Sequence, residues 1–172
     1  MKRNATKRLF LTAAASAAGS LMLAGCISTS NSAAVSDLPA NWRADARVES
    51  VTLQRSSDLD VSPEFDALFT ARVQAKVATC ATGSRALRLE ARLDKLTKAN
   101  PFVTAVLFGQ NKVRGTARLV DVATGRLVGE YTIGRTVTGS RLGAIAMAEA
   151  EEQMSDGFGA EICRQAFAAE TH

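Results

Sequence analysis

The sequence is poor in the residues that most often perform catalysis or bind metal. Its only histidine is His172, the last of 172 residues, where a chain end is least ordered. It contains no Gly-x-Ser-x-Gly motif, no glycine-rich phosphate loop, and no cysteine or histidine spacing suited to zinc. Its Asp and Glu residues are scattered and are best explained as surface charge. We therefore expect neither an enzyme nor a bound metal or cofactor.

The sequence also lacks an excess of one charge once its first 25 residues are set aside. The 21 Lys and Arg residues outnumber the 17 Asp and Glu residues only through Lys2, Arg3, Lys7 and Arg8. The formal net charge of +4 is therefore a property of the N-terminus. Because the rest of the chain has no net charge, we expect no nucleic-acid partner.

The four basic residues begin an export signal. They are followed by an Ala- and Leu-rich run from Leu9 to Leu23, which has the length of a secretory signal and is too short to span a membrane. The run ends in Leu23-Ala24-Gly25-Cys26, which resembles the lipobox of bacterial lipoproteins. The resemblance implies removal of residues 1–25 and attachment of lipid to Cys26. Since Ile27 follows the cysteine in place of Asp, it also implies anchoring in the outer membrane, with the domain facing the periplasm.

Export would carry two further thiols, Cys80 and Cys163, into an oxidising compartment. A disulfide between them is the favoured interpretation. The alternative is that both are buried free thiols, which behave as small apolar residues. A bridge across so long a loop would stabilise the fold by roughly 4 kcal/mol, chiefly by restricting the unfolded chain.

The remaining chain divides into a tether and one folded domain. Residues 26–41 comprise the lipidated cysteine and a stretch rich in Ser, Thr, Asn and Ala that has no apolar periodicity, and we predict a flexible tether there. Such a tether would let the domain stand away from the bilayer. Residues 42–172, which begin at Trp42, are predicted to form a single periplasmic domain with one hydrophobic core.

Two helices are predicted in this domain. The first starts at Ser62-Pro63-Glu64, where a capping hydroxyl, a proline at the first helical position and an acid at the positive end of the dipole agree. Apolar residues at steps of three and four continue it over residues 65–80. The second covers residues 142–162, where Gly157 and Gly159 indicate either a kink or the close approach of another element.

Four strands are predicted beside these helices, over residues 46–53, 87–94, 113–122 and 126–137. Apolar and charged residues alternate in the second of them, so that one face lies in the core and the other in water. Gly125 supplies the positive φ of a short hairpin, so the last two strands should pair antiparallel. The order strand, helix, strand, strand, strand, helix predicts a two-layer α+β fold, with a mostly antiparallel sheet and two helices on one face.

The polar face of this sheet is expected to carry several charged side chains. The basic ones are Arg88, Arg92, Arg114 and Arg118. The acidic ones are Glu90, Asp94 and Glu130. The arginines could attract an anionic polymer, but cross-strand ion pairing with the acids on the same face is the preferred explanation.

The segment from Lys98 to Lys112 is unusually long and apolar for a connection between strands. Its large apolar residues are Phe102, Val103, Val106, Leu107 and Phe108. They could pack back onto the edge of the sheet, or extend the flanking strands as a longer hairpin. The alternative is an exposed patch that contacts a protein or a membrane.

The stretch Val113–Val128, with its Asp-x-x-Thr-Gly hairpin before the terminal helix, resembles small envelope lipoproteins related to the curli-secretion and Pel-polysaccharide-export lipoproteins. In those families the domain is a two-layer α+β unit that often assembles into rings at the outer membrane and has no active site. The resemblance implies a non-catalytic accessory protein of assembly or export that contacts itself or other envelope proteins. The alternative is a membrane-tethered binding module for a small molecule or a glycan.

Overall fold

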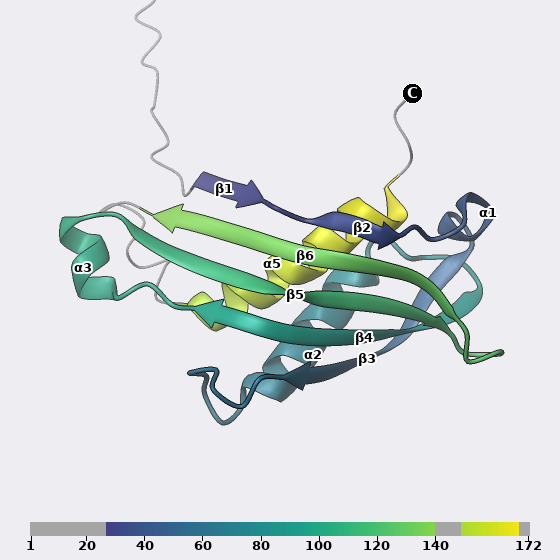
Figure 1. The fold of residues 1–172 in the computed structure, drawn as a ribbon, viewed down its shortest axis with the longest axis horizontal. Coiled ribbons are helices and arrows are strands. Elements are labelled where there is room, and N and C mark those ends of the chain that lie inside the picture. The colour runs from purple at the N-terminus through teal and green to yellow at the C-terminus, as the bar shows by residue number, and fades with distance from the viewer. Residues whose placement is uncertain (1–26, 140–148, 169–172) are drawn as a thin grey trace, which may run out of the picture.

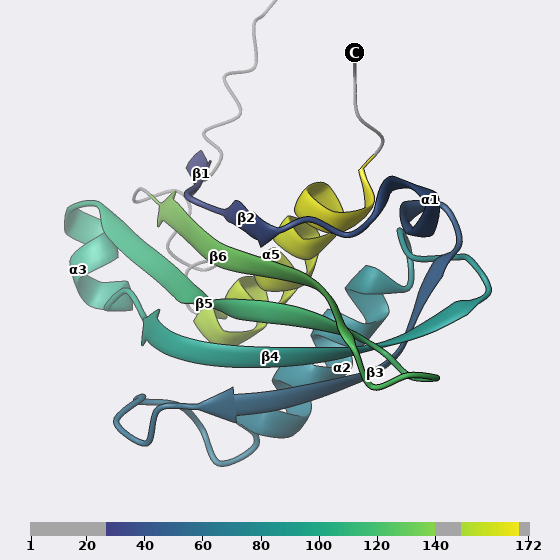
Figure 2. The same cartoon turned by 45° about the vertical axis from the view of Figure 1, so that its right-hand side comes forward.

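The computed structural model describes residues 27–139 and 149–168. It shows a twisted sheet with helices on one side (Figure 1; Figure 2). In chain order the elements are β1 (Ile27–Ser30), β2 (Ala33–Ser36), α1 (Ala40–Arg43), β3 (Ala46–Arg55), α2 (Phe65–Val77), β4 (Arg85–Thr97), α3 (Pro101–Val106), β5 (Gly109–Asp121), β6 (Leu127–Gly139), α5 (Ala150–Ile162) and the π-helical turn η2 (Cys163–Phe167).

The strands lie in the order β1, β6, β5, β4, β3, and β2 also pairs with β6. All neighbours are antiparallel except β3 and β4, which are parallel. A parallel pair needs a crossover connection, and α2 supplies it. The two long helices, α2 and α5, cover the same face of the sheet (Figure 2). The predicted two-layer α+β fold is therefore confirmed.

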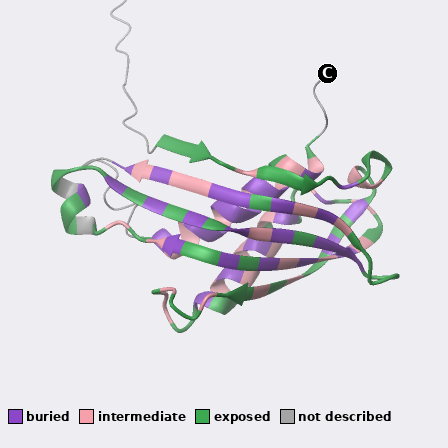
Figure 3. Cartoon of the chain, in the orientation of Figure 1, coloured by how far each residue is buried: buried purple, intermediate pink, exposed green. Residues whose placement is uncertain are grey.

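The alternation within the strands separates a buried face from a polar one (Figure 3). In β4 the buried residues are Leu87, Leu89, Ala91, Leu93 and, after the bulge, Leu96. The helices meet this face with apolar residues at helical spacing, and the ring of Phe69 in α2 lies 5.2 Å from that of Phe158 in α5. The apolar residues that alternate in β4 and those spaced by three and four in α2 thus belong to one hydrophobic core.

Gly159 allows α5 to approach α2 closely. A Cβ atom at this position would lie 2.7 Å from the Cβ atom of Lys76, well inside the contact distance of two carbons. Since α5 is continuous from Ala150 to Ile162, close approach is the observed effect of the glycine. The predicted beginning of this helix, residues 142–148, lies outside the described residues.

The predicted hairpin joins β5 to β6. Its turn contains Gly125 with a φ of 67°. The carboxylate of Asp121 accepts a hydrogen bond from the hydroxyl of Thr124 at 2.7 Å, which closes the loop from within. The Asp-x-x-Thr-Gly sequence is therefore a turn motif, and each of its three defined residues has a conformational role.

Cys80 and Cys163 form a disulfide, with their Cα atoms 5.7 Å apart. Cys80 lies three residues beyond the end of α2, and Cys163 begins η2 directly after α5. The bond joins the C-terminal ends of the two long helices. The predicted disulfide is confirmed, and the alternative of two free thiols is wrong.

The prediction of a flexible tether is wrong for most of its length. Residues 27–30 and 33–36 form β1 and β2 on the edge of β6, and residues 40–43 form α1. All residues of β1 and β2 are exposed, so these strands need no apolar alternation. They are held by backbone hydrogen bonds to β6, which a sequence pattern does not reveal. The folded part therefore begins at Ile27, not at Trp42.

A buried carboxylate also fastens β1 to α5. Glu161 is 2% exposed. It accepts hydrogen bonds from the hydroxyl of Ser30 at 2.7 Å, from Arg135 at 3.0 Å and from Nε of Arg164 at 3.0 Å. Burial raises the pKa of Glu161, but the hydrogen bonds from Ser30 and Arg164 outweigh it, and the pKa lies below its ordinary value of 4.5. Glu161 is therefore ionised at neutral pH and links the N-terminal strand to the core.

We expect the double substitution Cys80→Ser, Cys163→Ser to lower the unfolding free energy by about 4 kcal/mol, because the bond closes a loop with a sequence separation of 83. Denaturant titration followed by circular dichroism measures the loss. The reduced parent is the control and should unfold at the same denaturant concentration as the variant. Identical midpoints for the oxidised parent and the variant would show that the bond contributes no stability.

We expect Glu161→Gln to destabilise the fold at neutral pH by about 2 kcal/mol, because it leaves two arginines without their shared anion. The folded pKa lies below 4.5, so the stabilisation by ionised Glu161 is present above that value and is lost as the pH falls through the folded pKa. Denaturation at a series of acidic pH values should show a shallower decline for the variant. Glu152→Gln, on an exposed carboxylate of α5 that pairs with Arg72, is the control and should change both measurements little.

Candidate functional site

The segment between β4 and β5 projects from one end of the sheet as the short helix α3 and the residues after it (Figure 1). We call five of its side chains the apolar tip: Phe102, Val103, Val106, Leu107 and Phe108. Their exposed fractions are 87%, 49%, 81%, 65% and 76%, respectively. The expectations that this segment packs onto the sheet or extends the hairpin are therefore wrong. The exposure expected of an interaction patch is observed, and the interaction itself stays a prediction.

The sequence contains a start signal for α3, although the pattern of apolar residues did not predict a helix there. The side-chain oxygen of Asn100 accepts hydrogen bonds from the backbone N–H groups of Phe102 at 2.9 Å and Val103 at 3.3 Å. Pro101 occupies the first helical position. An Asn cap followed by proline is a helix start signal, because the cap satisfies free N–H groups and proline suits the first helical position.

Polar contacts hold the apolar tip in place from behind. Asn111 is fully buried, and its amide nitrogen donates a hydrogen bond to Gln153 of α5 at 2.9 Å. The hydroxyl of Thr104, also buried, donates to a backbone carbonyl of its own turn at 2.9 Å. A Cβ atom on Gly109 would lie 1.9 Å from the Thr104 hydroxyl oxygen, so only glycine fits where β5 begins. The tip is thus presented on a fixed turn while its apolar side chains remain exposed.

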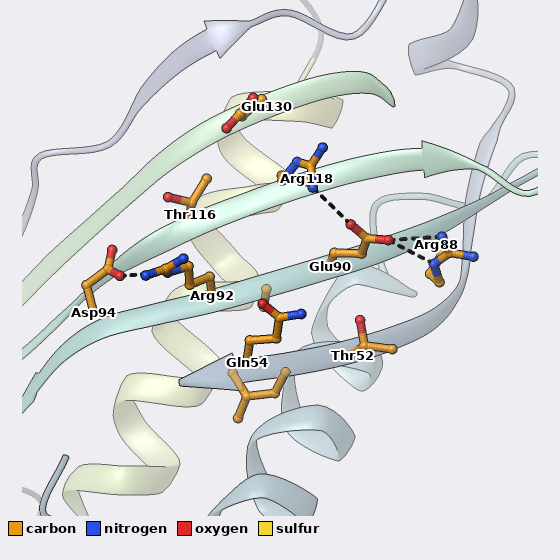
Figure 4. A pocket seen from close by; sticks show the side chains of 11 residues that line it. Thr52, Gln54, Arg88, Glu90, Arg92, Asp94, Thr116, Arg118 and Glu130 are labelled. Atoms are coloured by element: carbon orange, nitrogen blue, oxygen red, sulfur yellow. Dashed lines mark hydrogen bonds and ion pairs between the residues drawn. The ribbon is translucent and has the colours of Figure 1, made fainter. Parts of the chain in front are cut away.

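The open face of the sheet forms a polar groove of about 800 Å³ (Figure 4). Glu90 of β4 lies at its centre. Its two oxygens are 2.9 Å from Arg88 of the same strand and 3.3 Å from Arg118 of β5. Arg92 pairs with Asp94 at 3.2 Å. Three of the four arginines of this face are therefore engaged in ion pairs. Only the pair of Arg118 with Glu90 joins two strands as the sequence predicted, and the other two pairs lie within β4.

The fourth arginine belongs to a basic cluster nearer the apolar tip, which we define as Lys95, Lys112 and Arg114. A bulge after Leu93 leaves Lys95 exposed opposite Arg114. Lys112 precedes Arg114 by two residues in β5 and lies nearer the apolar tip. The three residues line a hollow of about 160 Å³. None of the ion pairs formed within residues 27–139 and 149–168 involves a member of this cluster. Like charges placed opposite each other across two strands are destabilising, so the cluster weakens the sheet unless an anion is present.

Three other kinds of site are a metal site, a membrane-spanning helix and the lipidation site. In the part of the chain that the structure describes, no group of three or more His, Cys, Asp or Glu residues could hold a metal ion. Among the described helices, none combines the length and the apolar character needed to cross a bilayer. The lipobox residues, Cys26 included, lie outside the described residues, so lipidation stays a prediction.

Comparison with known proteins supports the fold. No model of a protein family matches the chain, and no curated protein matches it. Among solved structures, the chain is similar to a point variant of the PelC dodecamer from Paraburkholderia phytofirmans, with 12% identity, a TM-score of 0.52, and coverage of 83% of this chain and 100% of that one. The PelC dodecamer of the same organism in another crystal form gives a TM-score of 0.50 at the same identity and coverage. The likeness shows a shared fold, in keeping with the resemblance to small Pel-export-related lipoproteins.

Proposed function

We propose that this chain is a non-catalytic accessory lipoprotein of the cell envelope that serves assembly or export by contacting copies of itself or another envelope protein. The observation that carries the proposal is the outer edge of the sheet. Residues 27–36 form this edge with neither a charged residue nor a proline. Charges and prolines are two of the means by which an edge strand avoids pairing with a second chain.

The similarity to PelC supports self-association, since that protein forms dodecamers on the same fold. Among the strands that the structure describes, β3 has β4 as its one neighbour and forms the second outer edge of the sheet. When identical chains contact each other through two different surfaces, each copy repeats the same contact with the next. The assembly closes into a ring if the rotation between neighbouring copies divides a full turn. Contact between the β1–β2 edge of one copy and a different surface of the next therefore fits a ring-shaped assembly.

The anchor completes the proposal. The lipobox-like sequence before Cys26 supports export and acylation, and Ile27 in place of Asp supports delivery to the outer membrane. The folded domain then lies in the periplasm, where an oxidising environment suits the disulfide between Cys80 and Cys163.

The second candidate is a membrane-tethered binding module for a small molecule or a glycan, and the groove on the open face favours it. Besides its ion pairs, the groove is lined by Thr52, Gln54 and Thr116, whose polar groups suit the hydroxyls of a sugar (Figure 4). A monomeric protein whose melting temperature rises with an oligosaccharide, but not after Thr116→Tyr fills the groove, would favour this candidate over the first.

We expect the mature protein to begin at Cys26 and to carry the mass of its acyl chains. Cys26→Ser should remove this mass and allow alkaline carbonate to release the protein from membranes, because no acyl chain then holds it. Intact mass spectrometry and membrane fractionation measure the two effects. Cys163→Ser is the matched control and should keep the acyl mass. A parent protein that retains Met1 and bears no acyl mass would refute the anchor.

We expect the detergent-extracted protein to have a native mass that is a multiple of its protomer mass. Val35→Lys should shift the mass toward the monomer, because Val35 lies on the uncharged outer edge with 65% of its surface exposed. Native mass spectrometry measures the change. Val122→Lys, on an exposed valine of the β5–β6 hairpin, is the control and should leave the mass unchanged. A monomeric parent would rule out self-association.

A further inference from the structure

The two outermost features of one end of the sheet are the apolar tip and the first residue of β1. Ile27 pairs with Thr138, and Gly109, which follows the tip, pairs with Gly139. The start of β1, the end of β6 and α3 therefore share this end, and the β5–β6 hairpin lies at the opposite end (Figure 1; Figure 2). We call the end that bears α3 the anchor end.

Exposed apolar side chains are concentrated at the anchor end. Of the nine large hydrophobic residues exposed in the described part of the chain, six are Ile27 and the five residues of the apolar tip. The other three are Val35, Val122 and Leu127, and they form no comparable group. An apolar concentration of this kind marks a contact surface.

The position of β1 limits how far the anchor end can lie from the bilayer. A residue spans at most about 3.6 Å, and Cys26 immediately precedes Ile27. A tether over residues 27–41 could have extended about 50 Å, but most of those residues are folded into the sheet and α1. A lipid on Cys26 therefore holds the anchor end at the membrane surface. This step rests on the lipid anchor of the proposed function.

The basic cluster lies behind the apolar tip on β4 and β5. Counted along β5 at about 3.4 Å per residue, Lys112 lies about 10 Å and Arg114 about 17 Å from Gly109. Long basic side chains reach toward phosphates from such positions while the apolar groups ahead of them enter the acyl region. A surface of anionic lipid would also supply an anion to the three cations.

We propose that the apolar tip inserts into the lipid leaflet that holds the acyl chains of Cys26, and that Lys95, Lys112 and Arg114 bind the phosphates of the surrounding headgroups. The domain then contacts the membrane at two places, the acylated N-terminus and α3. The partner of this surface is a bilayer containing anionic phospholipid. A second protein chain at the same place is the competing occupant, and the experiments below separate the two.

The insertion is tested on the acylated protein in vesicles of phosphatidylethanolamine and phosphatidylglycerol with brominated acyl chains, which quench nearby tryptophan. Phe102→Trp should shift its emission to the blue and be quenched. Val122→Trp, at the opposite end of the sheet, should show neither effect. Trp42, the single natural tryptophan, lies in α1 beside Arg85 and gives the unquenched background. An unquenched Phe102→Trp in acylated protein would overturn the inference.

A second measurement separates the tip from the anchor. On the Cys26→Ser background, Phe102→Ser with Phe108→Ser should weaken binding to the same vesicles by about tenfold or more, since two inserted rings are lost. The melting temperature should stay unchanged, because both rings are exposed. A smaller native particle with unaltered vesicle binding would instead assign the tip to a protein contact and refute the proposal. A parent protein without acyl mass would refute the lipid anchor but not the insertion of the tip, because the vesicle-binding measurement uses protein that carries no acyl chain.

The basic cluster is tested with a matched pair of double variants on the same background. Lys112→Gln with Arg114→Gln should weaken binding to phosphatidylglycerol vesicles by about tenfold at low salt, and the difference should vanish on vesicles of phosphatidylcholine alone. Arg88→Gln with Arg92→Gln removes equal charge from the same face farther from the tip and should have little effect. Equal losses of affinity for both double variants would show that the cluster contributes only nonspecific electrostatic attraction. Headgroup binding by the cluster would then be refuted.

Discussion

The antiparallel register that places Ile27 opposite Thr138 is the constraint on which the rest of the structure depends. It ends the freedom of the chain one residue after the proposed lipid attachment site. Because β6 runs through the sheet to the hairpin, this register also fixes which end of the sheet faces the anchor. Glu161 reinforces it by joining Ser30 to α5 through a buried ionic network.

The elements that the sequence predicted are those whose stabilising contacts are visible in local spacing. The alternation of β4 and the three- and four-residue apolar spacing of α2 indicate their structure within a few residues. The predicted capping role of Ser62 is wrong, because α2 begins at Phe65 without a side-chain cap and the Ser62 hydroxyl donates to Glu151 of α5. β1 and β2 could not be found in this way, since their side chains are exposed and their partners lie about a hundred residues away. α3 is an intermediate case. The pair Asn100-Pro101 is a local signal for a helix start, but the pattern of the apolar residues that follow does not predict a helix.

The charges of the open face show a similar limit. Of the ion pairs on this face, only that of Arg118 with Glu90 joins two strands as expected, and the pairs of Arg88 and Arg92 lie within β4. Strict alternation places Arg88, Glu90 and Arg92 correctly on this face. It cannot anticipate the bulge after Leu93, which exposes Asp94 and Lys95 in succession and sets Lys95 against Arg114. The four arginines that looked equivalent in sequence are therefore divided. Three are neutralised in the groove, and Arg114 joins two lysines near the tip.

The proposed second membrane contact would have a consequence that an acyl anchor alone does not have. Acyl chains on one residue hold a protein at the bilayer but leave it free to rotate about the point of attachment. An inserted tip on the other side of the anchor end would remove much of that freedom, because Asn111 joins Ala99, just before the tip, to Gln153 of α5. The outer edge formed by β1 and β2 would then keep one orientation relative to the membrane surface. Copies that share this orientation would have less orientational freedom to lose on association, which would lower the entropic cost of joining edge to edge.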